Sequence, residues 1–155
     1  MLSSKLKIQN EYYTSLKTWA QIVPYLDTNI VYWEAFHGNG RSAEYLRQLG
    51  LDVISEPVDF FESNYGQVII SNPPFSCVKN VMSYIKKLDK PFILLMPLNK
   101  ITCNYMNDFK NDLQLIVPSG RVAFEDADGI RMKPAPFACA FFCYKIGLDR
   151  DLIIL

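Results

Sequence analysis

The sequence has few of the residues that form metal centres, and no apolar run long enough for a membrane span. Its only histidine is His37, and its four cysteines form no C-x-x-C pair, so a structural zinc site is not expected. The N-terminus lacks the apolar core of a signal peptide, and the longest apolar runs, 92–98 and 137–144, are too short to cross a bilayer. These absences predict a soluble, intracellular, cytoplasmic protein with no metal ion and no membrane partner.

The sequence also lacks an excess of charge of either sign. Sixteen Lys and Arg balance sixteen Asp and Glu, which argues against a protein that holds nucleic acid by bulk electrostatics alone, so any such contact must be local. No repeat, low-complexity tract or Ser/Gly-rich linker divides the 155 residues, half of which are apolar. This length fits one hydrophobic core, and we expect a single domain over residues 1–155.

Hydrophobic periodicity alternates between helix-like and strand-like segments, which indicates βαβ units. Helices are expected at 16–23, 41–49, 78–88 (capped by Ser76) and 101–111. Strands are expected at 30–36, 52–55, 67–71, 92–96 and 113–117.

The C-terminal part differs, because no helix-length segment separates its strands. Segments 121–124 and 137–146 read as strands joined by residues 125–136, which predicts an antiparallel pair. The predicted fold class is therefore α/β, with a mostly parallel sheet, an antiparallel C-terminal strand pair and helices on both faces.

A glycine turn follows the first expected strand. Gly38-x-Gly40-x-x-Ala43 matches the dinucleotide-binding fingerprint, and Glu56 ends the second strand, where a carboxylate can accept hydrogen bonds from ribose hydroxyls. Glu34, four positions before the first glycine, would repel a pyrophosphate but can face an amino group. This favours S-adenosylmethionine over NAD, and the alternative is a tight strand-to-helix turn with a solvated Glu56.

The segment 71–75, Ser-Asn-Pro-Pro-Phe, lies between an apolar strand and a helix, where open α/β sheets place their active sites. Because proline has no N–H donor, this corner presents the amide oxygen of Asn72 and the carbonyl of Pro73 as acceptors. Two such hydrogen bonds would favour a pyramidal amine nitrogen with a free lone pair, in a near-attack geometry. Phe75 can stack on a base, and the alternative is a rigid turn with this ring in the core.

These motifs resemble those of the S-adenosylmethionine-dependent amino-methyltransferases, of the N6-adenine DNA methyltransferase type. Glu34-Ala-Phe-His-Gly-Asn-Gly40 is similar to the family's glycine motif, and Asn72-Pro-Pro-Phe75 matches its catalytic motif. Tyr12-Tyr13-Thr14 with Trp19 resembles its cofactor-wrapping segment, and residues 58–61 resemble the segment that holds the cofactor adenine. The resemblance covers roughly residues 11–146.

The resemblance implies a Rossmann-like methyltransferase sheet and transfer of methyl from S-adenosylmethionine to N6 of adenine in DNA. It implies a catalytic domain without a separate target-recognition domain. The implied catalytic residues are Asn72, Pro73, Pro74 and Phe75. The implied cofactor-binding residues are Tyr13, Thr14, Trp19, Glu34, Phe36, Gly38, Gly40, Glu56, Asp59 and Phe60. The short interval between Glu56 and Asp59 leaves open whether both touch the cofactor.

Several alternatives remain open at the level of sequence. Arg121, Arg131 and Lys133 surround the segment 125–136 and are candidates to meet DNA phosphates, unless this is simply a solvated loop. Similar enzymes modify RNA or protein, and a cofactor-binding subunit that needs a recognition partner is a further alternative. The small surface left for recognition predicts a homodimer, a recognition subunit or tolerance of many sequence contexts. His37 is expected in a solvent-facing loop, and Phe124 and Phe137 are both candidates for a second stacking face.

Overall fold

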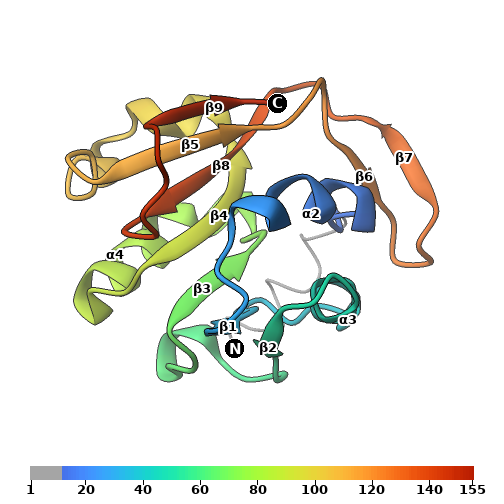
Figure 1. The fold of residues 1–155 in the computed structure, drawn as a ribbon, viewed down its shortest axis with the longest axis horizontal. Helices are drawn as coiled ribbons and strands as arrows, with labels where there is room; N and C mark the ends of the chain where they lie inside the picture. The colour runs from blue at the N-terminus through green and yellow to red at the C-terminus, as the bar shows by residue number, and fades with distance from the viewer. Residues whose placement is uncertain (1–11) are drawn as a thin grey trace.

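The structure is a computed structural model that describes residues 12–155. The start of the chain, where we expected no signal peptide, lies outside the described residues. A seven-stranded sheet forms the centre of the molecule, in the order β2-β1-β3-β4-β8-β5-β9 (Figure 1). Its strands are β1 (Val31–Trp33), β2 (Asp52–Ile54), β3 (Val68–Ser71), β4 (Phe92–Pro97), β5 (Leu113–Val117), β8 (Cys139–Tyr144) and β9 (Leu152–Ile154).

Most neighbouring strands are parallel, and β8 alone runs antiparallel to both of its neighbours, β4 and β5. Strands β3 and β4 are buried along their whole length. A parallel strand covered on both faces must be apolar throughout, which explains the uninterrupted apolar runs in the sequence. The predicted α/β class, with a mostly parallel Rossmann-like sheet, is confirmed.

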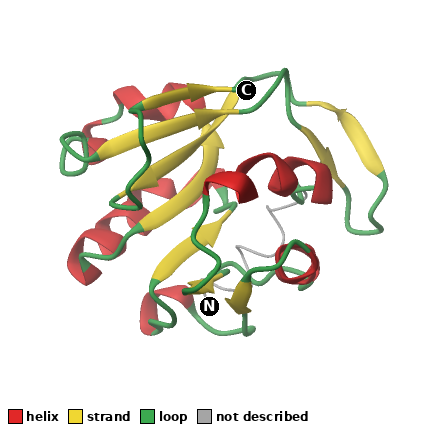
Figure 2. Ribbon diagram, in the orientation of Figure 1, coloured by secondary structure: helices red, strands yellow, loops and turns green. Residues whose placement is uncertain are grey.

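Helices cover both faces of the sheet (Figure 2). Helices α2 (Leu16–Ile22) and α3 (Arg41–Gln48) pack on one face, and α4 (Val78–Leu88) packs on the other. The fully buried apolar residues of these helices are Trp19 and Ile22 in α2, Ala43 and Leu46 in α3, and Val81, Met82 and Ile85 in α4. Among the described residues no helix combines the length and the apolar composition that a membrane span needs.

The helix ends follow local signals. The side chain of Ser15 accepts a hydrogen bond from Thr18 N at the start of α2, and Gly50, with φ +96°, ends α3. Helix α4 begins one residue later than a Ser76 cap would place it. The reason is that Phe75–Cys77 first forms a 3₁₀ turn, which makes Cys77 the residue before the helix.

The helix predicted at 101–111 is wrong. The chain there forms two 3₁₀ turns, η4 (Leu98–Thr102) and η5 (Asn104–Met106), followed by further short turns. The segment 101–111 contains three Asn residues and Thr102, and such side chains compete for backbone hydrogen bonds, as Thr102 Oγ1 does by donating to Asn99 O at 3.0 Å. These side chains favour turns over a continuous helix.

The predicted pairing of the C-terminal strands is also wrong. β6 (Ala123–Glu125) pairs with β7 (Arg131–Pro134) in a separate antiparallel hairpin, and β8 lies inside the main sheet. All six residues of β8 are buried, so this strand requires neighbours on both edges. The hairpin closes through the turn 126–129, in which Asp126 Oδ1 accepts from Asp128 N and Ile130 N. The short edge strand β9 was not predicted from the sequence either.

Candidate functional site

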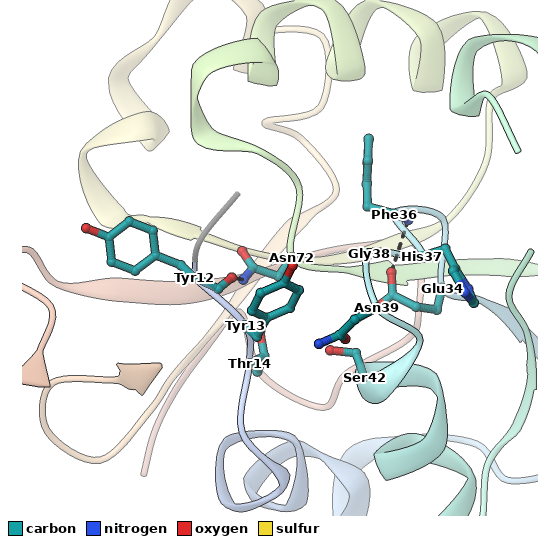
Figure 3. Close-up of a pocket in the computed structure, with 10 residues that line it drawn as sticks. All are labelled: Tyr12, Tyr13, Thr14, Glu34, Phe36, His37, Gly38, Asn39, Ser42 and Asn72. Carbon is teal, nitrogen blue, oxygen red and sulfur yellow. Dashed lines mark hydrogen bonds between the residues drawn. The ribbon is translucent and has the colours of Figure 1, made fainter. Parts of the chain in front are cut away.

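A pocket lies at the edge of the sheet where β1 and β3 end (Figure 3). The connections from these two neighbouring strands lead to opposite sides, so the pocket occupies the switch point at which open α/β sheets bind ligands. It is partly open to solvent. Its lining residues are Tyr12, Tyr13, Thr14, Glu34, Phe36, His37, Gly38, Asn39, Ser42 and Asn72.

Glu34, directly after β1, contributes a buried carboxyl group to this pocket. Its side chain is 1% exposed and accepts hydrogen bonds from Phe36 N, at 3.1 Å, and from the hydroxyl of Ser71. Burial raises the pKa of Glu34 to about 8, although both hydrogen bonds act in the opposite direction. The acid is therefore largely neutral at pH 7 in this structure, and a cation placed beside it would favour its ionised form.

Asn72, directly after β3, contributes a buried acceptor that has no partner. Its Nδ2 donates to the carbonyl of Tyr12 at 3.1 Å. A carbonyl only accepts, so the NH₂ end of the amide must face Tyr12, and Oδ1 is the end left free. This Oδ1 is buried and has no hydrogen-bond partner among the described residues. Such a group costs about 1–3 kcal/mol unless a ligand supplies a donor.

Two hydroxyl groups, those of Thr14 and Ser42, also line the pocket. Thr14 Oγ1 is buried and has no hydrogen-bond partner among residues 12–155. Ser42, in the first turn of α3, accepts a hydrogen bond from Trp19 Nε1 at 3.2 Å, so the hydroxyl proton of Ser42 remains free to donate. These two hydroxyls can serve an anionic or polar group of a ligand.

The glycine turn forms the wall between these groups. Gly38 and Gly40 have φ values of +56° and +80°, which side chains rarely adopt. The ring of Tyr13 lies against this turn, because a Cβ added at Gly38 would be 3.2 Å from Tyr13 Cε1. At Gly38 the turn thus brings backbone close to the pocket, between the lining residues His37 and Asn39.

His37 lines the pocket instead of facing solvent as expected. Its Nδ1 is 2.8 Å from Ser55 Oγ, and the Ser55 hydroxyl donates to the carbonyl of Glu34 at 3.1 Å. Since the Ser55 proton is used on Glu34, His37 Nδ1 must carry the proton of the other bond. Four lining residues were given no binding role from the sequence: Tyr12, His37, Asn39 and Ser42. The first three lie inside the quoted motifs, and Ser42 lies two residues beyond one of them.

The structure brings six predicted cofactor-binding or catalytic residues to the pocket: Tyr13, Thr14, Glu34, Phe36, Gly38 and Asn72. It does not bring Trp19 there, because this indole is fully buried, lies 5.8 Å from the ring of Phe141 and reaches the pocket only through Ser42.

The predicted adenine-binding segment also lies away from the lining. Phe60 is buried between Trp33 and Phe36, with ring centroids 5.5 and 4.7 Å away. The Asp59 carboxylate caps the turn η2 (Phe60–Glu62) by accepting from Phe61 N at 2.9 Å. Glu56 is exposed just beyond β2. The roles of these residues stay predictions.

The rest of the Asn-Pro-Pro-Phe corner is held by packing. Pro73 and Pro74 are buried, and the half-buried ring of Phe75 lies edge-on to Phe137 and Phe124 at 5.7 and 6.4 Å. Both candidates for a second stacking face therefore contact the same ring. Phe124 is 1% exposed and Phe137 is half-buried, so Phe137 is the more accessible of the two.

The predicted phosphate contacts lie on the hairpin side of the molecule. Arg121 precedes β6, and Arg131 and Lys133 alternate along β7, so the last two share one face of that strand. All three are exposed, and none lines the pocket. Within residues 12–155 no group of three or more His, Cys, Asp or Glu could hold a metal ion.

Comparisons with known proteins provide no residue-level guide to this site. No family model and no curated protein matches the chain. Among solved structures, precorrin-6y C5,15-methyltransferase from Geobacter metallireducens GS-15 is similar, with a TM-score of 0.48 and 11% identity over 90% of this chain and 96% of that chain. So few residues are shared that a site in this chain must be judged from its own side chains.

Proposed function

We propose that this protein transfers a methyl group from S-adenosylmethionine to an amino group, and that N6 of adenine in DNA is the acceptor. The observation that carries the proposal is the buried, unpartnered Oδ1 of Asn72, in the same pocket as the buried acid Glu34. An amine supplies the N–H donor that this oxygen lacks. The resemblance of both motifs to amino-methyltransferases supports the same reading.

The residues of the pocket fit the amino-acid end of S-adenosylmethionine. Ionised Glu34 would hold its ammonium group, and the hydroxyls of Thr14 and Ser42 would donate to its carboxylate. A pyrophosphate would instead lie beside a buried acid, which disfavours NAD. Glu56, exposed beyond β2, would accept hydrogen bonds from the ribose. When bound, the cofactor supplies a methyl group activated by its sulfonium.

The acceptors of the corner would hold the target amine. Asn72 Oδ1 and the carbonyl of Pro73 would each accept one of its N–H groups, which leaves the nitrogen lone pair free to attack. The carbonyl of Pro74 is already used by Cys77 N at 3.1 Å, so it does not compete for the amine. Phe75 would lie against the base, with Phe137 next to it.

The test is nucleoside mass spectrometry after incubation with S-adenosylmethionine and, separately, duplex DNA, single-stranded DNA or structured RNA. N6-methyladenine in DNA, absent with Asn72→Ala, is the expected result. A methylated nucleoside in RNA alone would move the activity to RNA. If the protein binds the cofactor but methylates none of these polymers, the proposal of a nucleic-acid substrate is overturned. That result would favour a protein substrate or a missing recognition subunit.

The glycine turn gives a second prediction. Gly38→Ala is expected to weaken binding of S-adenosylmethionine roughly tenfold, because the new methyl group must displace the ring of Tyr13 inside the pocket. Gly50→Ala is the matched control, since Gly50 also has positive φ but has nothing within 4 Å of the added Cβ. Calorimetric titration should show weaker binding for the first variant only. Equal affinities would contradict the close approach of this turn to the ligand.

The exposed cations of β7 give a third prediction. We expect Arg131→Ala/Lys133→Ala to weaken DNA binding about tenfold and to reduce the slope of log affinity against log salt by about 2, as two lost phosphate contacts require. Lys79→Ala/Lys87→Ala removes two exposed charges from α4, on the opposite face of the sheet, and is the control. Fluorescence anisotropy at several salt concentrations measures both quantities. An unchanged slope in the β7 variant would leave this hairpin without a role in DNA binding.

A further inference from the structure

The β6–β7 hairpin lies outside the main sheet and is held against α3 by hydrogen bonds. Arg41 donates from its guanidinium to the carbonyls of Asp126 and Ala127, at 3.2 and 3.0 Å, and lies 3.7 Å from the carboxylate of Glu125. The hydroxyl of Tyr45 donates to Glu125 Oε2 at 2.9 Å. Glu125 is therefore the side chain at which both donors of α3 meet.

The backbone of Glu125 in turn holds the N-terminal segment that lines the pocket. Tyr13 N donates to Glu125 O at 2.9 Å, and Glu125 N donates to Tyr13 O at 2.7 Å. Tyr13 thus forms an isolated antiparallel β-bridge with Glu125 of β6. The ring of Tyr12 also packs edge-on against Phe124, at 5.6 Å. Segment 12–14 is therefore placed by the hairpin.

This placement decides which end of the Asn72 amide is free. The carbonyl of Tyr12 accepts from Asn72 Nδ2, and no other hydrogen bond of this amide is formed within residues 12–155. Were the Tyr12 carbonyl to move away, the amide could rotate and present its NH₂ group, which cannot accept from an amine. The orientation of Asn72 thus depends on a contact made 60 residues earlier in the chain.

We infer that the β6–β7 hairpin sets the orientation of the Asn72 amide, and that Glu125 is the positioning residue that holds the hairpin in place. Glu125 acts through the backbone of Tyr13 and the carbonyl of Tyr12, and it is not one of the residues that line the pocket. The effect on catalysis rests on the proposed function, whereas the effect on the amide does not. The same hairpin carries Arg131 and Lys133, so the element that would contact DNA would also hold the acceptor of the target amine.

The test compares three variants by NMR of side-chain amides, with the Asn72 signals identified by their absence in Asn72→Ala. Glu125→Ala is expected to speed hydrogen exchange of the Asn72 NH₂ group at least about tenfold and to lower kcat by roughly the same factor. Glu125→Gln keeps an acceptor oxygen for Tyr45 and should restore both values to within about threefold, because the 2.9 Å hydrogen bond is retained and only the longer 3.7 Å ion pair with Arg41 is lost. Asp128→Ala changes an exposed acid on the same hairpin and should alter neither.

Should Glu125→Ala fail to fold, Tyr45→Phe removes a single donor and should shift exchange in the same direction by a smaller factor. Unchanged exchange and unchanged kcat in a folded Glu125→Ala would overturn the inference. Faster exchange in a protein whose wild type transfers no methyl group would support the positioning role and reject the proposed function instead. The two failures are therefore separable.

Discussion

The Asn72→Ala variant is expected to transfer methyl groups at least about a thousandfold more slowly than the wild type, and to bind S-adenosylmethionine within about threefold of it. The substitution removes the buried Oδ1 that would accept from the target amine, but leaves Glu34, Thr14 and Ser42 in place. Single-turnover kinetics on DNA measures the first quantity, and calorimetric titration measures the second.

A second substitution at this position distinguishes the role of the amide oxygen from that of the amide NH₂ group. Asn72→Asp keeps acceptor oxygens but loses the NH₂ group that donates to Tyr12 O, and places a carboxylate beside that carbonyl. We expect an intermediate loss, roughly ten- to hundredfold. Full activity in Asn72→Ala would remove Oδ1 from the mechanism. Full activity in Asn72→Asp would show that the contact with Tyr12 is not needed.

The affinity for S-adenosylmethionine should rise as the pH increases from 6 to 7.5, by about tenfold per pH unit. Burial raises the pKa of Glu34 to about 8, so in this range the empty protein holds a proton that an ammonium ligand must displace. Titration in two buffers of different ionisation enthalpy should show this proton being released. Glu34→Gln has no such proton, so its affinity should be low and independent of pH over the same range.

A ligand without the amino-acid end provides the control. 5′-Methylthioadenosine carries no ammonium group, so its binding to the wild type should change little between pH 6 and 7.5. Parallel pH profiles for both ligands would place the titrating group elsewhere. A flat profile for both would show that Glu34 is already ionised in the empty protein.

The same carboxyl group makes the stability of the protein fall as the pH rises, whereas the affinity for S-adenosylmethionine is expected to rise. Its folded pKa, about 8, lies above the ordinary value of 4.5, so its contribution is complete below pH 4.5 and is lost as the pH rises through 8. Glu34→Gln should therefore unfold at higher denaturant concentration than the wild type at pH 8.5, and the difference should shrink toward pH 5. Urea unfolding at both pH values measures this, and a variant less stable at pH 8.5 would contradict the assignment.

The sequence predicted those parts of the fold whose burial follows from the spacing of apolar residues along one segment of the chain. The apolar runs at 67–71 and 92–96 are β3 and β4, since a strand covered on both faces has no polar position. The stripe of α4 likewise predicts its buried side. The pairing of β8 could not be predicted, because it depends on which strand edges remain open after the rest of the sheet has formed. The failed helix at 101–111 shows apolar spacing overridden by turn-forming side chains.

Some residues of the candidate site were likewise predictable from the sequence, and others were not. The resemblance of the two motifs predicts that Glu34, Gly38 and Asn72 share one site, but it does not say which strands are neighbours. The structure brings these residues together because β1 and β3 are adjacent parallel strands. The positions of Trp19 and His37 could not be predicted. A local motif does not say whether a ring will fill the core or line a pocket.

The sequence by itself determined the chemical groups of this protein: an acid before a glycine turn, and an asparagine before two prolines, each directly after a strand. These follow from residues adjacent in the chain. Only the tertiary structure decided how the groups behave. The raised pKa of Glu34 comes from its burial, and the free oxygen of Asn72 comes from a contact with Tyr12, which β6 holds. Burial and hydrogen-bond partners are supplied by segments distant in sequence, so no local pattern contains them.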